Sequence, residues 1–429
     1  MSTRMKILRL RSFFSLGGPS DFSKTLQSTK AVRMRILGRS VVLGSVATCD
    51  VLQIGGTAIS GFGSLREGYR LGVMPLLGER IHLRVALGCL LRWRLSRWSY
   101  YALVAQLSQA RLILIWHDTI GIAPHLYRHV KIPIILVQNG MRGDVAPVDG
   151  LSFRDAIATL SPHPPKVDTY FVFGEQSETF LRPIVNARYV RAGSFRLNEY
   201  ALTRRQLAHE RPQGVSLGLI VSFPNKKDVP TGKVVENQQI FVSISRNQLS
   251  YHSYFRIDGI VAQVAAGVAR ELGVSFSIIG KRKDSDGLER EYFASIPGCE
   301  NVPVLGHEKG FGYEVAERFT HLLAIDSTLG YEMLALGKRV GFVANRMRVA
   351  GIESRDLTFG HPLSIPSDGP FWTSASTPAG IRDFVLRFLR LSDSEWAEQH
   401  QTITPRVMEL DRGNTMLRAH IDAVLGRSG

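Results

Sequence analysis

The first half of the chain alternates short apolar runs with longer stretches of helical character. Strands are predicted at 41–45, 51–55, 112–116, 132–138 and 170–173, because these short runs consist mostly of Val, Ile, Leu or Phe. Such runs are typical of parallel strands that helices cover on both faces. Between the second and third strands, a long helical zone is predicted over 78–109. This alternation predicts a doubly wound α/β domain.

The second half repeats this pattern after a segment rich in turn-forming residues. Residues 211–237 contain several Pro, Gly and charged positions, which predicts a domain junction. Strands are then predicted at 239–245, 274–280, 302–305, 321–325 and 339–343, and helices at 259–272, 286–294, 313–319 and 329–336. Further helices are expected at 378–389, with Thr377 as N-cap, at 394–403, stopping before Pro405, and at 414–425.

The expected fold is therefore α/β, with two Rossmann-like domains that face each other across a cleft. The predicted parts are an N-terminal domain (1–210), a second domain (211–400) and C-terminal helices (401–429). Ligands of open α/β sheets bind at the carboxyl ends of the strands, so the cleft is the expected place for two substrates.

The composition adds a strong positive charge to this picture. The 429 residues include 53 Lys and Arg against 37 Asp and Glu, a net charge of +16. Such a surplus attracts nucleic acid, an anionic membrane leaflet or a phosphorylated small molecule. The three cysteines are far apart and form no CxxC pair, so neither a zinc site nor a disulfide framework is indicated, and a reducing compartment fits best. No apolar run is long enough to predict a transmembrane helix.

The strongest candidate site follows the predicted strand 321–325. Ser327 and Thr328 fall at the cap positions of the next helix, whose N-terminus carries partial positive charge and suits a phosphate. Glu332 lies one turn further on the same face, where its carboxylate could accept both hydroxyls of a ribose. Gly337 is placed to end the helix. A plain structural strand–cap–helix unit would have the same pattern, so the residues alone leave both interpretations open.

Two other strings of the second domain carry cations at predicted strand ends. Ser245 and Arg246 follow the predicted strand 239–245, and an Arg fork can bind phosphate through two hydrogen bonds. Lys281 stands in a run of three cations after the strand 274–280. Both strings could equally be solvated turns. An Asp-Ser-Asp string at 284–286 is interpreted as a solvated turn rather than a metal site.

In the first domain, polar strings follow the apolar strands 112–116 and 132–138. His117 and Asp118 could supply a general base that activates an acceptor hydroxyl, and Asp144 is a further candidate. Asn139 and Arg142 could bind acceptor groups. Asn-Gly is also a favoured turn pair, so a purely structural role remains an alternative.

The segment 326–338 resembles the nucleotide-binding segment of GT-B glycosyltransferases, and the string Gly193-Ser194-Phe195-Arg196 resembles one that closes their first domain. Over residues 100–345 the chain is similar to bacterial surface-carbohydrate biosynthesis proteins of lipopolysaccharide and capsule type. The resemblance implies that Ser327, Thr328 and Gly330 belong to the turn that holds the donor diphosphate, with Glu332 at the ribose. It also implies that His307 lies near the base, and that no metal or other cofactor is needed.

The helical zone from 80 to 98 carries five arginines interleaved with Trp93 and Trp98, at positions 80, 84, 92, 94 and 97. Basic and aromatic residues on one helix are typical of an interfacial membrane segment, although a half-buried helix with a charged outer face has the same composition. A cytoplasmic protein, peripheral on the inner face of the cell membrane, would reach a lipid-linked acceptor.

The predicted function is transfer of a sugar from a nucleotide-sugar donor to a surface-glycan acceptor, either free or lipid-linked. The alternatives are a sugar-nucleotide 2-epimerase, a polyol-phosphate transferase of similar fold, and a nucleic-acid-binding protein. An epimerase needs no basic membrane zone. A nucleic-acid partner is not expected, because neither a zinc finger nor an aromatic RNP string is present.

Overall fold

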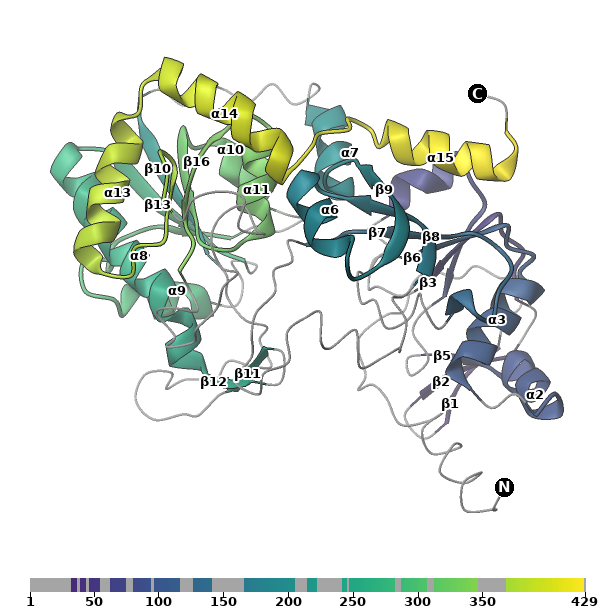
Figure 1. Cartoon of the computed structure of the whole chain (residues 1–429). Helices are drawn as coiled ribbons and strands as arrows, with labels where there is room; N and C mark the ends of the chain where they lie inside the picture. The colour runs from purple at the N-terminus through teal and green to yellow at the C-terminus, as the bar shows by residue number, and fades with distance from the viewer. Residues whose placement is uncertain are drawn as a thin grey trace.

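The computed structural model contains two parallel-sheet domains and, among the residues it describes, two small additional sheets (Figure 1). It describes residues 32–36, 39–43, 46–54, 62–74, 80–93, 96–115, 126–140, 166–204, 214–221, 241–244, 247–281, 287–306, 312–345 and 368–427. No helix in these described ranges is long and apolar enough to cross a membrane.

The first domain is built on a six-stranded sheet in which every neighbouring pair is parallel. Its spatial order is β4 (Leu71–Met74), β3 (Val51–Ile54), β6 (Leu112–Ile115), β7 (Ile134–Val137), β8 (Lys166–Val172) and β9 (Asn186–Arg191). The three central apolar runs β3, β6 and β7 are buried at all four positions, as strands between two helical layers should be. The predicted strands 51–55, 112–116, 132–138 and 170–173 are confirmed.

The helical zone predicted over 78–109 divides into two helices, α2 (Leu83–Leu91) and α3 (Arg97–Leu107). Trp93 follows α2 with a φ of 53°, a left-handed conformation that ends a helix. The segment 41–45 contributes a strand, β2 (Arg39–Leu43), but in a separate three-stranded sheet with β1 (Val32–Ile36) and β5 (Arg80–His82).

The second domain has a six-stranded parallel sheet of Rossmann order. Its strands are, in space, β14 (Val304–Leu305), β13 (Ser275–Ile279), β10 (Ser216–Ile220), β15 (His321–Ala324), β16 (Arg339–Val343) and β17 (Trp372–Thr373). Numbered along the chain, the order is 3-2-1-4-5-6, which reverses between β10 and β15. The associated helices are α8 (Tyr251–Leu272), α9 (Leu288–Ala294), α10 (Tyr313–Glu317), α11 (Thr328–Ala335) and α13 (Pro378–Arg390).

A strand forms within the predicted range 239–245, but its predicted place as the first strand of this domain was wrong. Residues 241–244 form β11 (Phe241–Ile244), which pairs antiparallel with β12 (Asn247–Ser250) outside the main sheet. The central position belongs to β10, which is buried throughout. β10 lies inside the segment 211–237, which was interpreted as the boundary between the domains. Gly218 fits this place, because a Cβ there would lie 2.8 Å from the Phe319 ring.

The predicted end of the helix 394–403 was also wrong, whereas Thr377 does cap α13 by accepting a hydrogen bond from the Gly380 amide. Helix α14 (Asp393–Val407) starts at a Ser392 capping box and continues through Pro405. Proline removes the hydrogen bond to the carbonyl of residue 401. Because Gln401 is exposed, water can satisfy that carbonyl instead.

The C-terminal segment returns from the second domain to the first. Helix α14 lies on the second domain, and α15 (Thr415–Leu425) lies over the first (Figure 1). Leu417, Ile421 and Leu425 share a buried cluster with β3 and β6 of the first sheet. Tyr69 donates a hydrogen bond to Asp422, at 3.0 Å. The last helix therefore ties the two domains together.

Candidate nucleotide site at the domain junction

The candidate site lies where the Rossmann sheet changes direction, at the carboxyl end of β15. Helix α11 begins there with Ser327 as its N-cap, but the Ser327 side chain makes no capping hydrogen bond. Ser327 and Thr328 are half-buried, so both retain accessible surface at the helix N-terminus. Backbone N–H groups and the helix dipole make such a position suitable for a phosphate.

Two glycines fix the position of α11. A Cβ on Gly330 would lie 2.4 Å from the Cβ of Ala324, so this glycine allows the helix to approach β15 closely. Gly337 has a φ of +87° and ends the helix, as predicted. Its amide bonds to the Leu334 carbonyl, and the Lys338 amide bonds to the Met333 carbonyl, which together form a Schellman motif.

Glu332, one turn into the same helix, is buried and contacts the first domain. Its side chain is only 6% exposed, and the Ser194 hydroxyl donates to its carboxylate over 2.5 Å. Burial raises the pKa of Glu332 to about 7, although hydrogen bonds from Ser194 and Tyr313 and the positive charge of Arg196 act in the opposite direction. The carboxylate proposed for a ribose therefore also joins the two domains.

Side chains of α7 (Phe195–Thr203) and its C-cap Arg204 extend this contact to α10. Tyr200 stacks on Tyr313 with ring centroids 4.6 Å apart. Arg204 forms a salt bridge of 2.6 Å with Glu317, whose side chain is almost fully buried. We name this contact, made by α7 on one side and α10 and α11 on the other, the junction.

The chain reaches the junction through a tight crossing at Gly193. Gly193 has a φ of +71°, and a Cβ there would lie 2.0 Å from the Glu409 carbonyl oxygen of the returning segment. Gly193 and Leu410 form an isolated antiparallel bridge. Asn198 holds the same crossing, since its amide donates to the Ala192 carbonyl and to Asn414 and its oxygen accepts from the Asp411 amide.

The string Gly193-Ser194-Phe195-Arg196 was interpreted only as a family resemblance, so its role in the junction was missed. Ser194 caps α7 by accepting from the Leu197 amide and also contacts Glu332. A serine at a predicted helix start signals the cap. Nothing in the local sequence signals a contact with a residue 138 positions away.

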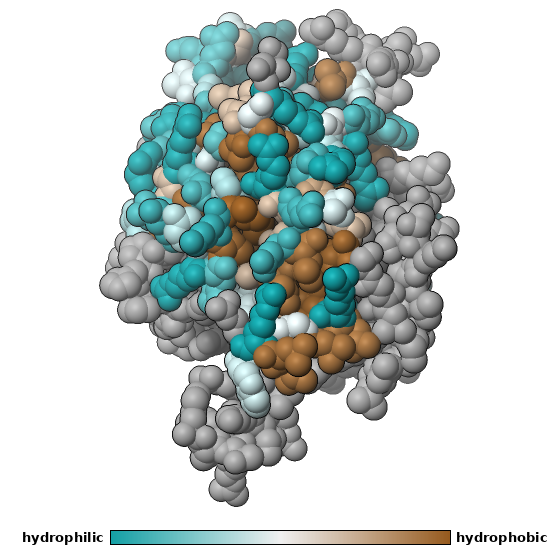
Figure 2. Space-filling model, turned by 90° about the vertical axis from the view of Figure 1, so that its right-hand side faces the viewer, coloured by the Kyte–Doolittle hydropathy of each residue, from teal (hydrophilic) through white to brown (hydrophobic). Residues whose placement is uncertain are grey.

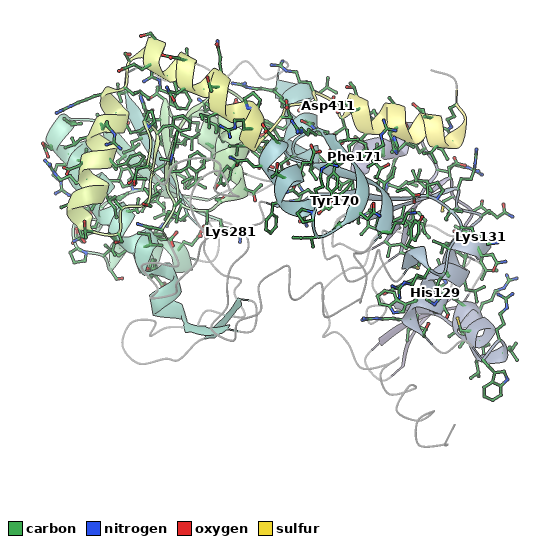
Figure 3. The ribbon with its side chains drawn as sticks, in the orientation of Figure 1. His129, Lys131, Tyr170, Phe171, Lys281 and Asp411 are labelled. Atoms are coloured by element: carbon green, nitrogen blue, oxygen red, sulfur yellow. The ribbon has the colours of Figure 1, made fainter. Side chains whose placement is uncertain are left out.

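Lys281 follows β13 at the same edge of the sheet and is exposed. Its backbone amide donates to the buried Glu289 carboxylate over 2.9 Å, which fixes the turn. Figure 3 shows Lys281 on the side of the second domain that is nearer to the first. β13 and β15 flank the central strand β10, so a cation at the end of β13 adds positive potential at the same end of the sheet as the α11 N-terminus.

On the first domain, the structure describes Asn139 but not the other predicted acceptor and base residues. The buried Gln138 precedes it and organises this strand end, because its amide oxygen accepts from the Phe173 amide and its nitrogen donates to Ser177. Asn139 is half-buried beyond it. The remaining predicted site residues lie outside the described residues: His117, Asp118, Arg142, Asp144, Ser245, Arg246 and His307.

The described part of the chain contains no group of three or more His, Cys, Asp or Glu side chains placed to hold a metal ion. The three cysteines are buried and free. The Asp-Ser-Asp string at 284–286 lies outside the described residues.

Two Rossmann-like domains, joined at the carboxyl ends of their sheets and tied by a returning C-terminal helix, define a GT-B protein. Residues 135–424 match the model of a family described as "putative O-antigen biosynthesis protein". This match covers more than half of the chain, so the protein belongs to that O-antigen biosynthesis family. A comparison with curated proteins found no match to the sequence.

Solved structures support the same fold. MnaA of S. aureus, solved with UDP, is similar over 88% of this chain and 97% of its own, with 10% identity and a TM-score of 0.52. The wall teichoic acid polymerase TagF is similar over 88% of both chains, with 12% identity and a TM-score of 0.50. At these identities the likeness concerns the fold, and the prediction of two facing Rossmann-like domains is confirmed.

Proposed function

We propose that this protein transfers a sugar from a nucleotide-sugar donor to a surface-glycan acceptor. The GT-B fold and the O-antigen family support a glycosyltransferase role. The observation that carries the donor assignment is the position of α11. Its accessible N-terminus lies at the switch point of the Rossmann sheet, and the buried Glu332 follows one turn along the same helix.

The donor would lie with its diphosphate at Ser327 and Thr328 and its ribose at Glu332. Lys281 would add positive charge at the end of β13, on the other side of the central strand β10, while Gly330 keeps the helix close to the sheet. The uridine diphosphate in the MnaA structure is consistent with a nucleotide on this fold. His307 is proposed as a further donor contact on the resemblance alone. Ser245 and Arg246 are proposed on the same ground only, because β11, which precedes them, lies outside the main sheet.

The transfer step needs a base on the acceptor side. The acceptor oxygen bonds to the anomeric carbon, the bond from that carbon to the diphosphate oxygen breaks, and the acceptor proton passes to the base. We propose His117 or Asp118 as this base, with Asp144 as the alternative, and Asn139 and Arg142 as acceptor contacts. The developing negative charge on the leaving diphosphate is stabilised by the α11 N-terminus, so the reaction requires no metal ion.

We further propose that the protein works in the cytoplasm, peripherally on the inner face of the cell membrane, on a lipid-linked acceptor. The basic segment that includes α2 supports this placement, as argued below.

A polyol-phosphate transferase is the second candidate function, because the similar TagF is a wall teichoic acid polymerase. Both candidates use a nucleotide donor at the same place, but they differ in what the diphosphate carries. A panel of donors therefore separates them, and the same panel tests the epimerase alternative through formation of an epimer without any acceptor.

The test is a thermal-shift panel of nucleoside diphosphates, CMP, nucleotide sugars and CDP-glycerol. A ligand that binds only the native state raises its melting temperature. We expect one base to stabilise the wild type, and Ser327→Ala and Glu332→Ala to lose that shift. Ser392→Ala is the matched control, since it removes a serine N-cap on the same domain at α14. If no nucleotide stabilises the wild type, the donor site is wrong.

A further inference from the structure

The positive charge of this protein is concentrated in one stretch of sequence. Residues 80–143 contain nine Lys and Arg and one acidic residue, Asp118, a net of +8 out of the +16 of the whole chain. The described parts of this stretch include α2, α3 and the segment 126–132, and all of them belong to the first domain. Half of the excess charge therefore lies in this stretch of the sequence, and Arg84, Arg92 and Arg97 belong to or directly follow α2 and α3.

The same region exposes large apolar side chains. Most of the exposed hydrophobic side chains of the described residues are on α2 or directly after it: Leu83, Leu87, Leu90, Leu91 and Trp93. Leu91 is 80% exposed and Trp93 is 75% exposed. Figure 2 shows hydrophobic side chains gathered low on this side of the molecule with hydrophilic side chains around them. We name these five residues the α2 ridge.

The backbone holds the end of this ridge in an unusual conformation. Trp93 has a φ of 53°, which is uncommon for a bulky residue, and its amide donates to the Leu90 carbonyl. Positive φ at a non-glycine residue costs free energy and often marks a functional position. Trp93 directly follows Arg92 at the end of α2, and its side chain is 75% exposed.

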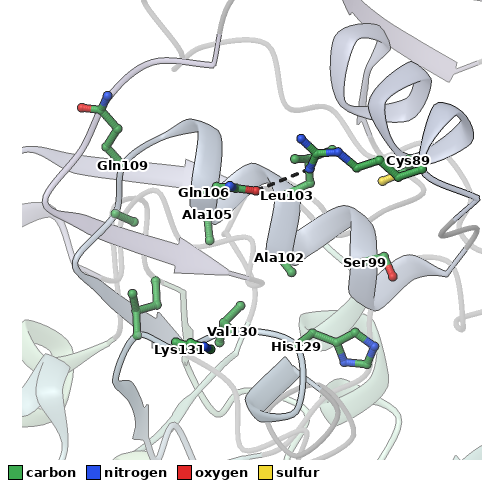
Figure 4. A pocket seen from close by; sticks show the side chains of 13 residues that line it. Cys89, Ser99, Ala102, Leu103, Ala105, Gln106, Gln109, His129, Val130 and Lys131 are labelled. Carbon is green, nitrogen blue, oxygen red and sulfur yellow. Dashed lines mark hydrogen bonds between the residues drawn. The ribbon is translucent and has the colours of Figure 1, made fainter.

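A pocket of about 410 Å³ lies behind the ridge, between α3 and the segment 129–132 (Figure 4). None of its thirteen lining residues is acidic, and three of them can carry positive charge: Arg92, His129 and Lys131. The Arg92 guanidinium reaches Gln106 at 3.5 Å across one side. Ser99 and Gln109 supply further polar groups, while Leu103 and Val130 supply apolar wall.

We propose that the α2 ridge and this pocket dock the protein on an anionic lipid bilayer, with the ridge among the acyl chains and a lipid phosphate in the pocket. Exposed leucine and tryptophan beside arginine match the two layers of a membrane surface, which is apolar inside and anionic at the headgroups. The proposal deepens the proposed function, because it names the surface that brings the enzyme to a lipid-linked acceptor.

Charge and apolarity together favour a membrane over other occupants. A second copy of this chain would bring two cationic faces together, which is unfavourable. Nucleic acid would match the cations but would leave the exposed leucines of the ridge in water. A bilayer satisfies both sets of side chains.

The test is sedimentation of the full-length protein with vesicles of phosphatidylcholine alone and of equal parts phosphatidylcholine and phosphatidylglycerol. We expect partitioning at least about tenfold stronger on the anionic vesicles, decreasing as salt is added. The double substitution Leu91→Ser and Trp93→Ser should weaken it by about tenfold or more. Leu202→Ser is the control, because Leu202 is 60% exposed on the same domain but outside the ridge.

A separate set of substitutions tests the role of the pocket. Lys131→Gln and Arg92→Gln should each weaken binding to anionic vesicles by about fivefold and leave binding to neutral vesicles unchanged, whereas Arg66→Gln, away from the pocket, should do neither. Soluble glycerol phosphate should compete only weakly, since it lacks the acyl chains. A free-phosphate site would instead give full competition and would overturn the lipid assignment.

A further readout keeps the result independent of folding and of the proposed function. Tryptophan emission should shift to the blue on anionic vesicles in the wild type, and Trp93→Phe should lose most of that shift while still sedimenting. Equal vesicle binding by all variants, ridge-dependent dimerisation or binding to DNA alone would overturn the proposal. The nucleotide-induced thermal shift should survive in the ridge variants, so failure of docking is distinguishable from failure of the donor site.

Discussion

The junction and the α2 ridge differ in which side chains they bury and which they expose to solvent. At the junction, the ionisable side chains of Glu332 and Glu317 are buried, and Ser194 and Arg204 of the other domain bind them. On the ridge, Leu91 and Trp93 are exposed in a segment that contains almost no acid. A buried charge is tolerated only when it is paired, and an exposed apolar patch marks a contact surface.

This difference predicts which residues affect both stability and nucleotide binding and which affect membrane binding alone. The junction is a preorganised polar site, so its residues should matter for stability and for ligand binding together. The ridge contributes little to the fold, so its residues should matter for binding alone. The predictions below test this separation, from the largest expected effect to the smallest.

The largest effect is expected at the crossing that leads into the junction. Gly193→Ala should destabilise the protein by about 3 kcal/mol or more, because the residue combines positive φ with a backbone oxygen 2.0 Å from the added Cβ. Gly214→Ala is the matched control, since Gly214 also has positive φ (+79°) but no atom within 4 Å of an added Cβ. It should cost only about 1 kcal/mol. Chemical denaturation measures both, and equal losses would contradict the crowding argument.

Removal of the central carboxylate should have the next largest effect. Glu332→Ala leaves the Ser194 hydroxyl buried without its acceptor, so we expect a loss of about 1–3 kcal/mol. Glu332→Gln keeps an acceptor oxygen and should cost less. A double-mutant cycle with Ser194→Ala should give a coupling of about 0.5–3 kcal/mol. Additive single effects would show that the contact does not join the domains energetically.

The raised pKa of Glu332 predicts a pH dependence of stability. Its pKa of about 7 lies above the ordinary value of 4.5, so between these values the folded state binds more protons than the unfolded state. The free energy of unfolding should therefore decrease as pH rises from about 4.5 to about 7. Glu199, whose pKa burial also raises to about 7, acts in the same direction. Comparison with Glu332→Gln isolates the Glu332 contribution, and identical pH profiles would contradict it.

The sequence predicted the local units well and the non-local ones poorly. The segment from Ser327 to Gly337 was placed correctly, because strand burial, helix start and glycine stop are signalled by adjacent residues. The central strand β10 was assigned to the boundary between the domains, because the Pro- and Gly-rich residues around it dominated the interpretation. The role of Ser194 depends on a partner 138 positions away, and no local pattern encodes such a contact.

A pair of serine caps gives a smaller effect that separates ligand binding from folding. Ser392→Ala should cost about 1 kcal/mol, because Ser392 and Glu395 form a complete capping box. Ser327→Ala should cost much less, because the Ser327 side chain makes no capping hydrogen bond. The nucleotide-induced thermal shift should show the reverse order. If Ser327→Ala destabilises the unliganded protein as much as Ser392→Ala does, its hydroxyl supports the helix and not a phosphate.

The smallest effect on stability is expected on the ridge. Leu91→Ser should change the free energy of unfolding by no more than about 0.5 kcal/mol, because a side chain that is 80% exposed loses little contact. Leu103→Ser, on the neighbouring helix α3, is the contrast: Leu103 is 6% exposed, and the substitution should cost several kcal/mol, about 2–5 by analogy with other truncations of buried leucine. Denaturation in the absence of lipid measures both. A large loss from Leu91→Ser would mean that the ridge packs against other parts of the chain, and the separation between a structural junction and a docking ridge would then fail.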